Sequence, residues 1–499
     1  MNNSSENQDI PSRETNPAVS NTSGAFFDPA WNDLPVPAWL GNSLAQEQPA
    51  PVQETEKDGY TFKPNGEIRE RGTSNLRPPS TESLARLQRE RGETFLREQR
   101  YLEAIASFSQ LIELEPTSTY GYTNRVYAYF AIQEYAKAIT DLDEILKLQP
   151  DSAWAFAERG EAYRLLGDYP KAISDLDQAI ELDYDLGQAY FSRGSIYLAH
   201  KDYWKATANL DRVIELLPDY PTAFYTRGEA YRLRGEYRLA LEDFDHYLDA
   251  EATPWGFSAR GQTHYNLKEY QKAIADFDES LALTPEQVEV IIQRGKAYLK
   301  LGDYAQAAAN FEEAIRVKPD DAWAYSQLGE VKRLGKNFDE AIAVLNQAIA
   351  LDPNLGWAYA SRAEAHRNLR NHPQAIADYS KVIELDPNST WGYIQRGDVY
   401  RAMGEFQLAL NDYDHVIEQH PDNAWTYVLR NATLRQLEGY KLTIEDYNRA
   451  IELDPESAWA YARRAKAHSQ LEMYEQALQD YERAIQLDPR RLASFLERA

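Results

Sequence analysis

The sequence of 499 residues contains no cysteine, which excludes disulfides, thiolate metal sites, iron–sulfur clusters and cysteine nucleophiles. It also contains no run of 18 apolar residues, so it predicts no membrane-spanning helix. The stretch from Met1 to Asp9 lacks the basic-then-apolar pattern of a signal peptide. We therefore expect a soluble, cytoplasmic protein with no membrane insertion.

Basic residues are scarce, with 53 lysines and arginines against 79 acidic residues and a net charge of −26. A chain with this charge is repelled by nucleic acid, whose affinity for proteins comes from Lys and Arg near phosphates, so no nucleic-acid partner is expected. No two of the eight histidines are four residues apart, which gives no helical metal site. The sequence carries no P-loop, dinucleotide fingerprint or nucleophile elbow. We expect no cofactor, no metal and no enzymatic activity.

Residues 1–82 differ in composition from the rest of the chain. They hold ten of the 24 prolines, with 12 acidic and 6 basic residues among many Ser, Asn and Gln. Such a segment cannot bury enough apolar surface to offset the entropy of ordering it, so it is expected to be disordered. Within it, residues 26–40 form an apolar island that is typical of a short docking segment, with Phe26, Phe27, Trp31, Leu34, Trp39 and Leu40.

From residue 83 onward the sequence repeats, with prolines mostly 34 residues apart from Pro116 to Pro489. If each of these prolines is position 32, twelve repeats fill 83–491 and start at 85, 119, 153, 187, 221, 254, 288, 322, 356, 390, 424 and 458. The first helix of each repeat is expected at roughly positions 2–14, with positions 4, 7, 8, 11 and 14 on one helical face. Apart from position 7, the residues at these positions are mostly apolar or small. A second helix follows with Ala at position 20 in eleven repeats and Phe, Leu or Tyr at position 24. It ends at the proline.

This 34-residue unit resembles the tetratricopeptide repeat (TPR), and the tract with Phe156, Gly160, Tyr163, Ala172 and Leu176 matches the family pattern nearly throughout. The resemblance implies an all-α fold, a right-handed superhelical solenoid of helix-turn-helix repeats, with a groove lined by the first helices. Residues 492–499 would then form a short C-terminal cap. Position 7 is Arg in eleven repeats, where the family favours Leu, and its place at the core edge indicates a structural role.

The positions that line the groove in the TPR family carry a recurrent set of large residues. Position 2 is tryptophan in seven repeats and position 12 is arginine in six, and an acid often stands at position 9. The tryptophans are Trp154, Trp255, Trp323, Trp357, Trp391, Trp425 and Trp459; the arginines are Arg164, Arg232, Arg333, Arg367, Arg401 and Arg435; the acids are Glu161, Glu229, Glu330, Glu364 and Asp398.

Two interpretations of these groove positions stay open. The indoles and guanidinium groups are favoured anchors for a partner peptide, whose carboxylates would meet the arginines. Alternatively, each tryptophan packs on the preceding repeat and each acid pairs with the arginine three residues later. The acids of the second helix, such as Asp141 with Asp143, Asp175 with Asp177 and Asp276 with Asp278, recur in most repeats and are expected on a solvated outer face.

The pattern favours a non-enzymatic scaffold or adaptor that binds protein partners in the groove, chiefly in repeats eight to eleven. Alternatives are an assembly or regulatory factor whose own tail gates the groove, a recognition subunit for an enzyme acting in trans, and a glycan or RNA binder that uses the tryptophans. Chaperone-binding members of the TPR family carry Lys at position 5 and Asn at position 9. No repeat here has Asn at position 9, so Hsp70 and Hsp90 tails are unlikely partners.

Overall fold

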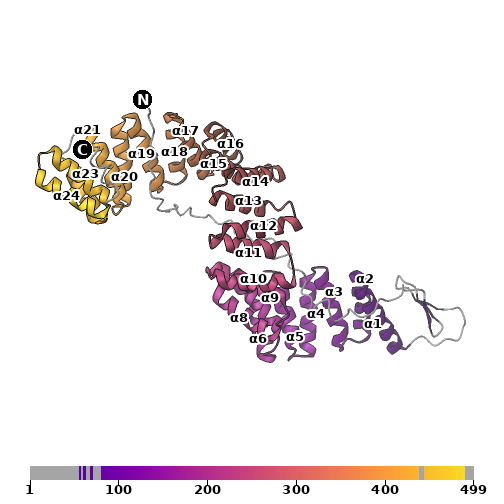
Figure 1. Cartoon of the computed structure of the whole chain (residues 1–499). Helices are drawn as coiled ribbons and strands as arrows, with labels where there is room; N and C mark the ends of the chain where they lie inside the picture. The colour runs from indigo at the N-terminus through magenta and orange to yellow at the C-terminus, as the bar shows by residue number, and fades with distance from the viewer. Residues whose placement is uncertain (1–54, 58–59, 63–67, 71–79, 438–442, 489–499) are drawn as a thin grey trace. The chain divides into compact units, whose positions relative to one another are not determined.

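The computed structural model describes residues 55–57, 60–62, 68–70, 80–437 and 443–488 (Figure 1). The predicted docking segment at 26–40 and the predicted cap at 492–499 lie outside these residues and stay predictions. The described residues fall into two compact units, one within 26–283 and the other within 284–499.

Three short strands lie in the segment for which the sequence predicts no regular structure. They are β1 (Thr55–Lys57), β2 (Tyr60–Phe62) and β3 (Ile68–Glu70). They pair antiparallel in the order β1-β2-β3, with Thr55 opposite Phe62 and Tyr60 opposite Glu70. Strands of three residues are too short to show a periodic pattern in the sequence.

The repeats are all-α, with two helices for each predicted repeat among the described residues. In the unit within 26–283 they are α1 (Thr81–Arg97), α2 (Tyr101–Leu114), α3 (Thr119–Ala131), α4 (Tyr135–Leu148), α5 (Ala153–Leu165), α6 (Tyr169–Leu182), α7 (Gly187–Ala199), α8 (Tyr203–Leu216), α9 (Pro221–Arg234), α10 (Tyr237–Ala250), α11 (Pro254–Asn266) and α12 (Tyr270–Leu283). In the unit within 284–499 they are α13 (Val288–Lys300), α14 (Tyr304–Val317), α15 (Ala322–Leu334), α16 (Phe338–Leu351), α17 (Gly356–Asn368), α18 (His372–Leu385), α19 (Thr390–Met403), α20 (Phe406–Gln419), α21 (Ala424–Leu437), α22 (Thr443–Leu453), α23 (Ala458–Gln470) and α24 (Tyr474–Leu487).

The turn between the helices of a repeat depends on one residue in the left-handed conformation, at position 15. Gly167, Gly235, Gly302 and Gly404 adopt it with φ between 78° and 83°. In seven other repeats a Gln, Lys, Arg or Glu adopts it with φ of 60–64°. A positive φ ends the first helix and lets the backbone reverse. Glycine therefore makes this turn in four repeats, and longer polar side chains occupy the same position in seven others.

Close contact between the paired helices explains the small residues of the repeat. Gly160 faces Leu176, so that a Cβ atom on Gly160 would lie 2.8 Å from Leu176 Cγ. In repeat ten, a Cβ on Gly397 would lie 2.8 Å from the ring of Tyr413. Small residues at positions 8 and 20 thus make room for the large residue at position 24, which is fully buried in most repeats. Each repeat buries this residue in a core shared with its neighbour.

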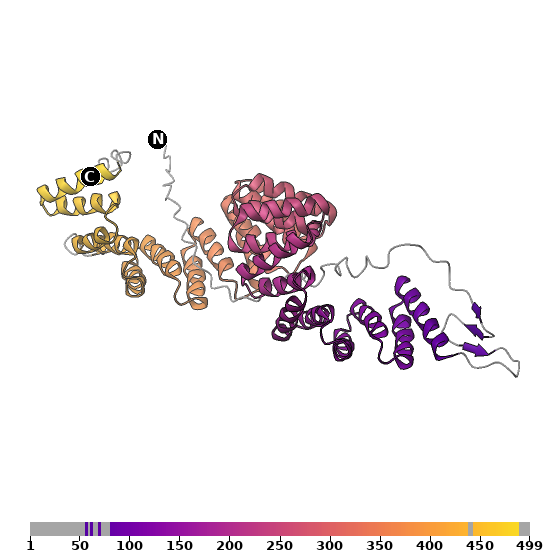
Figure 2. The ribbon, with the colours of Figure 1, turned by 90° about the horizontal axis from the view of Figure 1, so that it is seen from below.

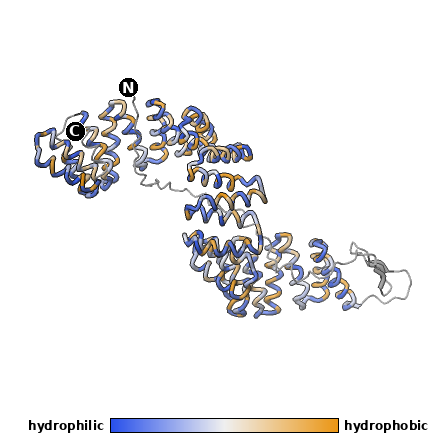
Figure 3. The backbone as a smooth tube through the Cα atoms, in the orientation of Figure 1, coloured by the Kyte–Doolittle hydropathy of each residue, from blue (hydrophilic) through white to orange (hydrophobic). Residues whose placement is uncertain are grey.

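Within each unit the helix pairs stack in chain order (Figure 2). The helices carry hydrophobic and hydrophilic positions in alternation along their length, as expected for elements that are buried on one side only (Figure 3). First helices of neighbouring repeats contact each other directly, as α5 does with α7 and α15 with α17. The side of each unit formed by the first helices is called the first-helix face below.

Candidate functional site

A row of arginines at position 7 joins the two helices of most repeats, and several of these arginines also bond to the preceding repeat. In repeat three, Arg159 Nε and Nη2 donate to the carboxylate of Asp175 on α6, at 2.7 and 2.8 Å. Arg159 Nη1 donates to Asp143 on α4 at 2.6 Å. Each partner lies 16 residues away, one later and one earlier in the chain. The same contacts recur for Arg227 with Asp243 and Asp211, Arg260 with Asp276 and Asp245, and Arg430 with Asp446 and Asp414.

These ion pairs are mostly shielded from water. Within a pair, each partner stabilises the charged form of the other. The hydrogen bonds with Asp175, and then with Asp143, raise the pKa of Arg159, although burial opposes them. Burial raises the pKa of Asp141, while its hydrogen bond with Arg125 lowers it. A bidentate pair of this geometry is held strongly, and removal of one partner would leave a buried charge. The geometry therefore agrees with the structural role expected for position 7.

The acids on the second helices were only partly predicted correctly. Asp141, Asp175 and Asp276 stand at position 23 and are buried, not solvated as the sequence analysis expected. They precede the core residue at position 24 and face the arginine of position 7. Asp143, at position 25, is more exposed and bonds to Arg159 of the next repeat. The recurrence of these acids therefore reflects a repeated ion pair between helices.

Repeat eight replaces this ion pair with apolar residues. Position 7 is Leu328, which is buried, and position 23 is Val344. The link to repeat seven is supplied instead by Lys332, whose Nζ lies 3.4 Å from Glu312 Oε1. Both members of the pair change together, so that no buried charge is left without a partner.

On the first-helix face, five acids at position 9 pair with the arginine at position 12. In repeat five, Arg232 donates to both oxygens of Glu229 at 2.9 and 2.6 Å. Arg333 does the same with Glu330 at 2.8 and 2.6 Å. The other three pairs are Arg164 with Glu161, Arg367 with Glu364 and Arg401 with Asp398. The arginines of these five pairs are thus oriented by their own helices.

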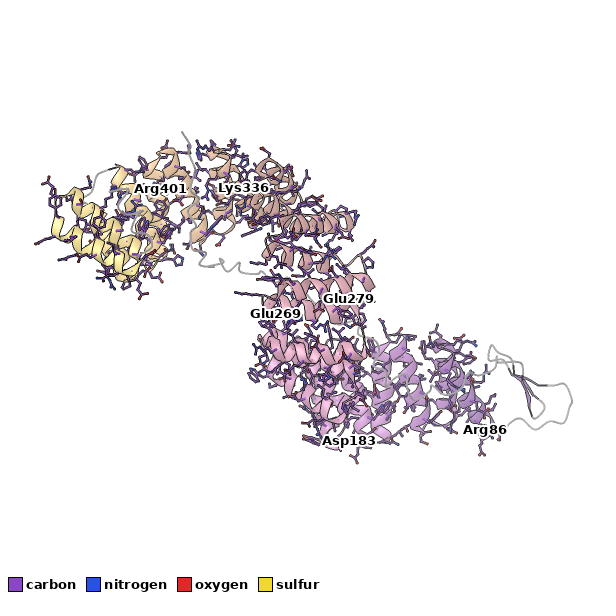
Figure 4. The ribbon with its side chains drawn as sticks, in the orientation of Figure 1. Arg86, Asp183, Glu269, Glu279, Lys336 and Arg401 are labelled. Atoms are coloured by element: carbon purple, nitrogen blue, oxygen red, sulfur yellow. The ribbon has the colours of Figure 1, made fainter. Side chains whose placement is uncertain are left out.

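In repeats nine and ten, tyrosines from the second helix complete these pairs. Tyr379 donates to Glu364, and Tyr413 donates to Asp398, both at 2.8 Å. The arginines of these two pairs are more exposed than those of the other three: the Arg367 side chain keeps 37% of its surface and the Arg401 side chain keeps 34%. Arg401 lies on α19 (Figure 4). Arg367 Nη1 also donates to Gln395 of the next repeat, at 2.7 Å.

The seven tryptophans of position 2 divide into two groups. Trp255, Trp323, Trp357 and Trp425 are exposed, with 38%, 42%, 41% and 50% of their surface accessible. Trp255 Nε1 donates to Tyr247. In repeats eight, nine and eleven, indole rings on first helices are therefore partly exposed to solvent. Tryptophan side chains are on average more buried than this.

The other three tryptophans pack against the preceding repeat. Trp154 lies 5.8 Å from the ring of Tyr127, and Trp391 meets Tyr379 edge-on with the centroids 5.7 Å apart. Trp459 packs on Tyr447 and also contacts Trp425. Position 2 is thus neither uniformly exposed nor uniformly structural.

Glu158 is a fully buried carboxyl on the first helix of repeat three that the sequence analysis did not single out. Its Oε1 accepts a hydrogen bond from Gln188 at 2.9 Å, and its Oε2 has no hydrogen-bond partner. Burial raises the pKa of Glu158 to about 8, and nearby Glu161 adds to the shift. Position 6 carries a charge in only two other repeats, as Glu90 and Arg463, and the rarity of an acid there was the available signal in the sequence.

The described residues hold no group of three or more His, Asp or Glu side chains arranged to bind a metal ion. In the same part of the chain, no helix is both long and apolar enough to cross a membrane.

Family models of the tetratricopeptide repeat match the chain at residues 160–201, 254–287, 292–355, 356–389, 393–423 and 458–491. Members of this family are generally protein–protein interaction scaffolds and typically are not enzymes. A search of the curated proteins found no match.

Several solved structures are similar to the chain. A tetratricopeptide repeat protein from Parabacteroides merdae is 21% identical over 50% of this chain and 98% of its own, with a TM-score of 0.41. Yeast Tom70 is 16% identical over 84% of this chain and 100% of its own, with a TM-score of 0.40. At these identities the likeness concerns the fold and not the partners. The helix pairs, the small residues between them and the family matches together show that the chain belongs to the tetratricopeptide repeat family.

Proposed function

We propose that the chain is a non-enzymatic adaptor that binds an extended segment of a partner protein on the first-helix face of repeats eight to eleven. The observation that carries this proposal is the exposure of Trp323, Trp357 and Trp425 on that face. Exposed apolar surface of this size tends to mark an interaction site, and tryptophan is among the residues that contribute most to binding.

The ion pairs of the same face support the proposal because they fix the groups that flank the indoles. Arg367 and Arg401 are held by Glu364 and Asp398, and each still has surface accessible to a ligand. A guanidinium that is already oriented loses little side-chain entropy when it binds a carbonyl or carboxylate. We infer that the indoles contribute most of the affinity and that the arginines fix the direction of the bound segment.

The proposal is tested by selecting ligands for the full-length protein from a displayed library of short random peptides. Hydrogen exchange of the protein with and without a selected peptide then locates the bound segment. We expect protection on α15, α17, α19 and α21, with little change on α16, α18 and α20.

The matched control is the full-length variant Trp357→Ala, which should abolish the protection without changing helicity. Protection confined to the second helices, or protection that persists in this variant, would contradict the proposal. In that case, the exposed indoles would not be the binding surface.

A further inference from the structure

An exposed indole lies away from the first-helix face, at the turns of repeats four and five. Trp204 on α8 is 71% exposed, and the guanidinium carbon of Arg234 from α9 lies 3.3 Å from the centroid of its ring. Arg234 also donates to Thr207 at 3.1 Å and to Glu236 at 2.7 Å. The cation–π contact and these hydrogen bonds fix the guanidinium against the ring, so the exposed part of the indole is presented in a defined orientation.

Glu236 also lines a shallow pocket of about 320 Å³ on the same surface, between α9, α10 and α11. The pocket is formed by Gly235, Glu236, Tyr237, Arg238, Leu239 and Leu267. Gly235 keeps it open, because a Cβ atom there would have no heavy atom within 4 Å, whereas repeats four and six carry Lys201 and Lys268 at this turn position. Trp204 and this pocket together are called the turn patch below.

The edge of the turn patch is positively charged, in a chain whose net charge is −26. Arg238 lines the pocket, and Lys268 directly follows Leu267. Both residues are exposed, and neither forms an ion pair with another residue that the structure describes. The turn patch therefore attracts an occupant that combines apolar side chains with acidic residues.

Residues 26–40 of the same chain have the complementary composition. They hold four aromatic residues and three prolines, with two aspartates and no basic residue. Proline-rich segments bind to aromatic surfaces because their extended conformation is already formed and loses little entropy. The charge and the apolar content of this segment therefore both suit the turn patch.

The chain between this segment and the repeats is long enough to allow the contact. Residues 41–54 and 71–80 alone would extend about 80 Å. α8 is seven helices along the stack from α1, where the repeats begin, and packed helices lie about 8–10 Å apart, so the turn patch is at most about 70 Å along the stack. Residues 26–40 can therefore reach it within one molecule.

We propose that residues 26–40 bind the turn patch of their own chain, with a proline or aromatic ring on Trp204 and an apolar side chain in the pocket. Because the segment is covalently attached, its effective concentration is on the order of 1 mM, and even a weak contact is mostly formed. The turn patch lies outside the first-helix face, so this inference is independent of the proposed function.

The experiment uses the full-length protein with the photo-crosslinking residue benzoylphenylalanine in place of Trp31. Irradiation of dilute protein, followed by mass spectrometry, identifies the residues that the segment contacts. We expect cross-links within one molecule to α8, to α10 and to the turn between α9 and α10. Cross-links to the first helices, cross-links formed only between two molecules, or none at all would overturn the inference.

Two variants locate the contact. Trp204→Ala removes the ring, and Gly235→Gln fills the pocket with a side chain that adopts the same backbone conformation at Gln133 in repeat two. Each should lower the cross-link yield at least about fivefold. The matched controls are Trp425→Ala on the first-helix face and Gly404→Gln at the equivalent turn of repeat ten, and an equal reduction in the controls would overturn the inference.

Competition provides a measurement without a cross-linker. A labelled peptide of residues 24–42 is titrated by fluorescence anisotropy with the full-length parent and with the full-length double variant Trp31→Ala and Trp39→Ala. We expect the peptide to bind the double variant at least about tenfold more tightly, because the attached segment no longer covers the turn patch. Equal affinities for the two proteins would overturn the inference.

Discussion

Two rows of arginine run along the first helices of the array, and they differ in where the partner carboxylate lies. Arg159 at position 7 bonds to acids 16 residues away on two other helices. Arg367 at position 12 bonds to Glu364, three residues away on its own helix. In the first arrangement the ion pair itself joins separate helices and repeats. In the second, the ion pair stays within one helix and orients a partly exposed side chain.

The comparison teaches that similar ion pairs in one protein serve different purposes. The position 7 pairs are largely buried and join separate helices, so their loss should affect stability. The position 12 pairs lie within one turn of a helix, and in repeats nine and ten the arginine side chains keep 37% and 34% of their surface. Partly exposed pairs of this kind contribute only a few tenths of a kcal/mol. Under the proposed function, these two arginines serve binding more than stability. The following predictions, ordered by expected effect, test this difference.

The largest effect is expected when a position 7 pair is broken. Arg159→Ala leaves Asp175 buried without its cation and should lower the free energy of unfolding by about 3 kcal/mol or more. The loss is measured by thermal and denaturant unfolding followed by circular dichroism, and hydrogen exchange should place it in α5 and α6.

A double variant provides the control for that experiment. Arg159→Leu combined with Asp175→Val copies the apolar pair that repeat eight uses, Leu328 with Val344. It should recover most of the lost stability because no buried charge remains unpaired. A double variant as unstable as Arg159→Ala would show that the ion pair contributes more than charge compensation.

Glu158 sharpens the comparison because it is a buried carboxyl whose hydrogen bond comes from an amide and not from a cation. Its pKa is raised to about 8, so the unfolded chain loses this proton at lower pH than the folded protein does. The free energy of unfolding should therefore fall as pH rises from the ordinary carboxyl range to about 8. Glu158→Gln should remove this fall and gain stability on the order of 3 kcal/mol at pH 9 relative to the parent.

The measurement is denaturant unfolding of parent and Glu158→Gln across that pH range. The two curves should converge at low pH, where the parent carboxyl is protonated in both states. A constant difference at all pH values would show that Glu158 is ionised in the folded protein.

Two tryptophans at the same position of adjacent repeats should behave differently. Trp391 packs edge-on against Tyr379, whereas Trp357 is 41% exposed. Trp391→Ala should cost about 2 kcal/mol of stability through lost packing, and Trp357→Ala less than about 1 kcal/mol. Unfolding of the two variants under identical conditions checks the ranking, and equal losses would mean that position 2 has one role throughout.

The smallest effect on stability is expected from the position 12 row. Arg367→Ala combined with Arg401→Ala should cost less than about 1 kcal/mol, since Tyr379 and Tyr413 still donate to the acids. The same double variant should weaken the binding of a selected peptide and reduce its salt dependence, because screening acts on contacts between charges. Unchanged affinity and salt dependence would assign both arginines to pairing within the helix alone.

The fold could be predicted from the sequence because its determinants recur at fixed positions. Gly or Ala at position 8, Ala at 20 and a large residue at 24 describe contacts between two helices that are close in the chain. Twelve copies reinforce one another, and the pattern predicted the two helices that each repeat has among the described residues. The strands β1 to β3 occur once and are short, so no repeated pattern in the sequence predicted them.

The candidate site was harder to predict because its properties depend on contacts between repeats. The sequence assigned Asp175 to the surface, since nothing in its own helix indicates that Arg159 faces it. Likewise, position 2 is tryptophan in repeats nine and ten alike, and nothing in the sequence separates Trp357 from Trp391. Burial of each indole depends on residues of the neighbouring repeats, which the local pattern does not describe.

The central claim is that the exposed indoles of the first-helix face bind a partner segment. The most direct test compares the affinity of a selected peptide for Trp357→Ala and for Trp204→Ala in the full-length protein. Trp204 is 71% exposed on the second helix α8 and serves as a matched indole away from the face. We predict a loss of about 2 kcal/mol in binding for Trp357→Ala and no change for Trp204→Ala. An equal loss in both variants, or none in Trp357→Ala, would contradict the claim.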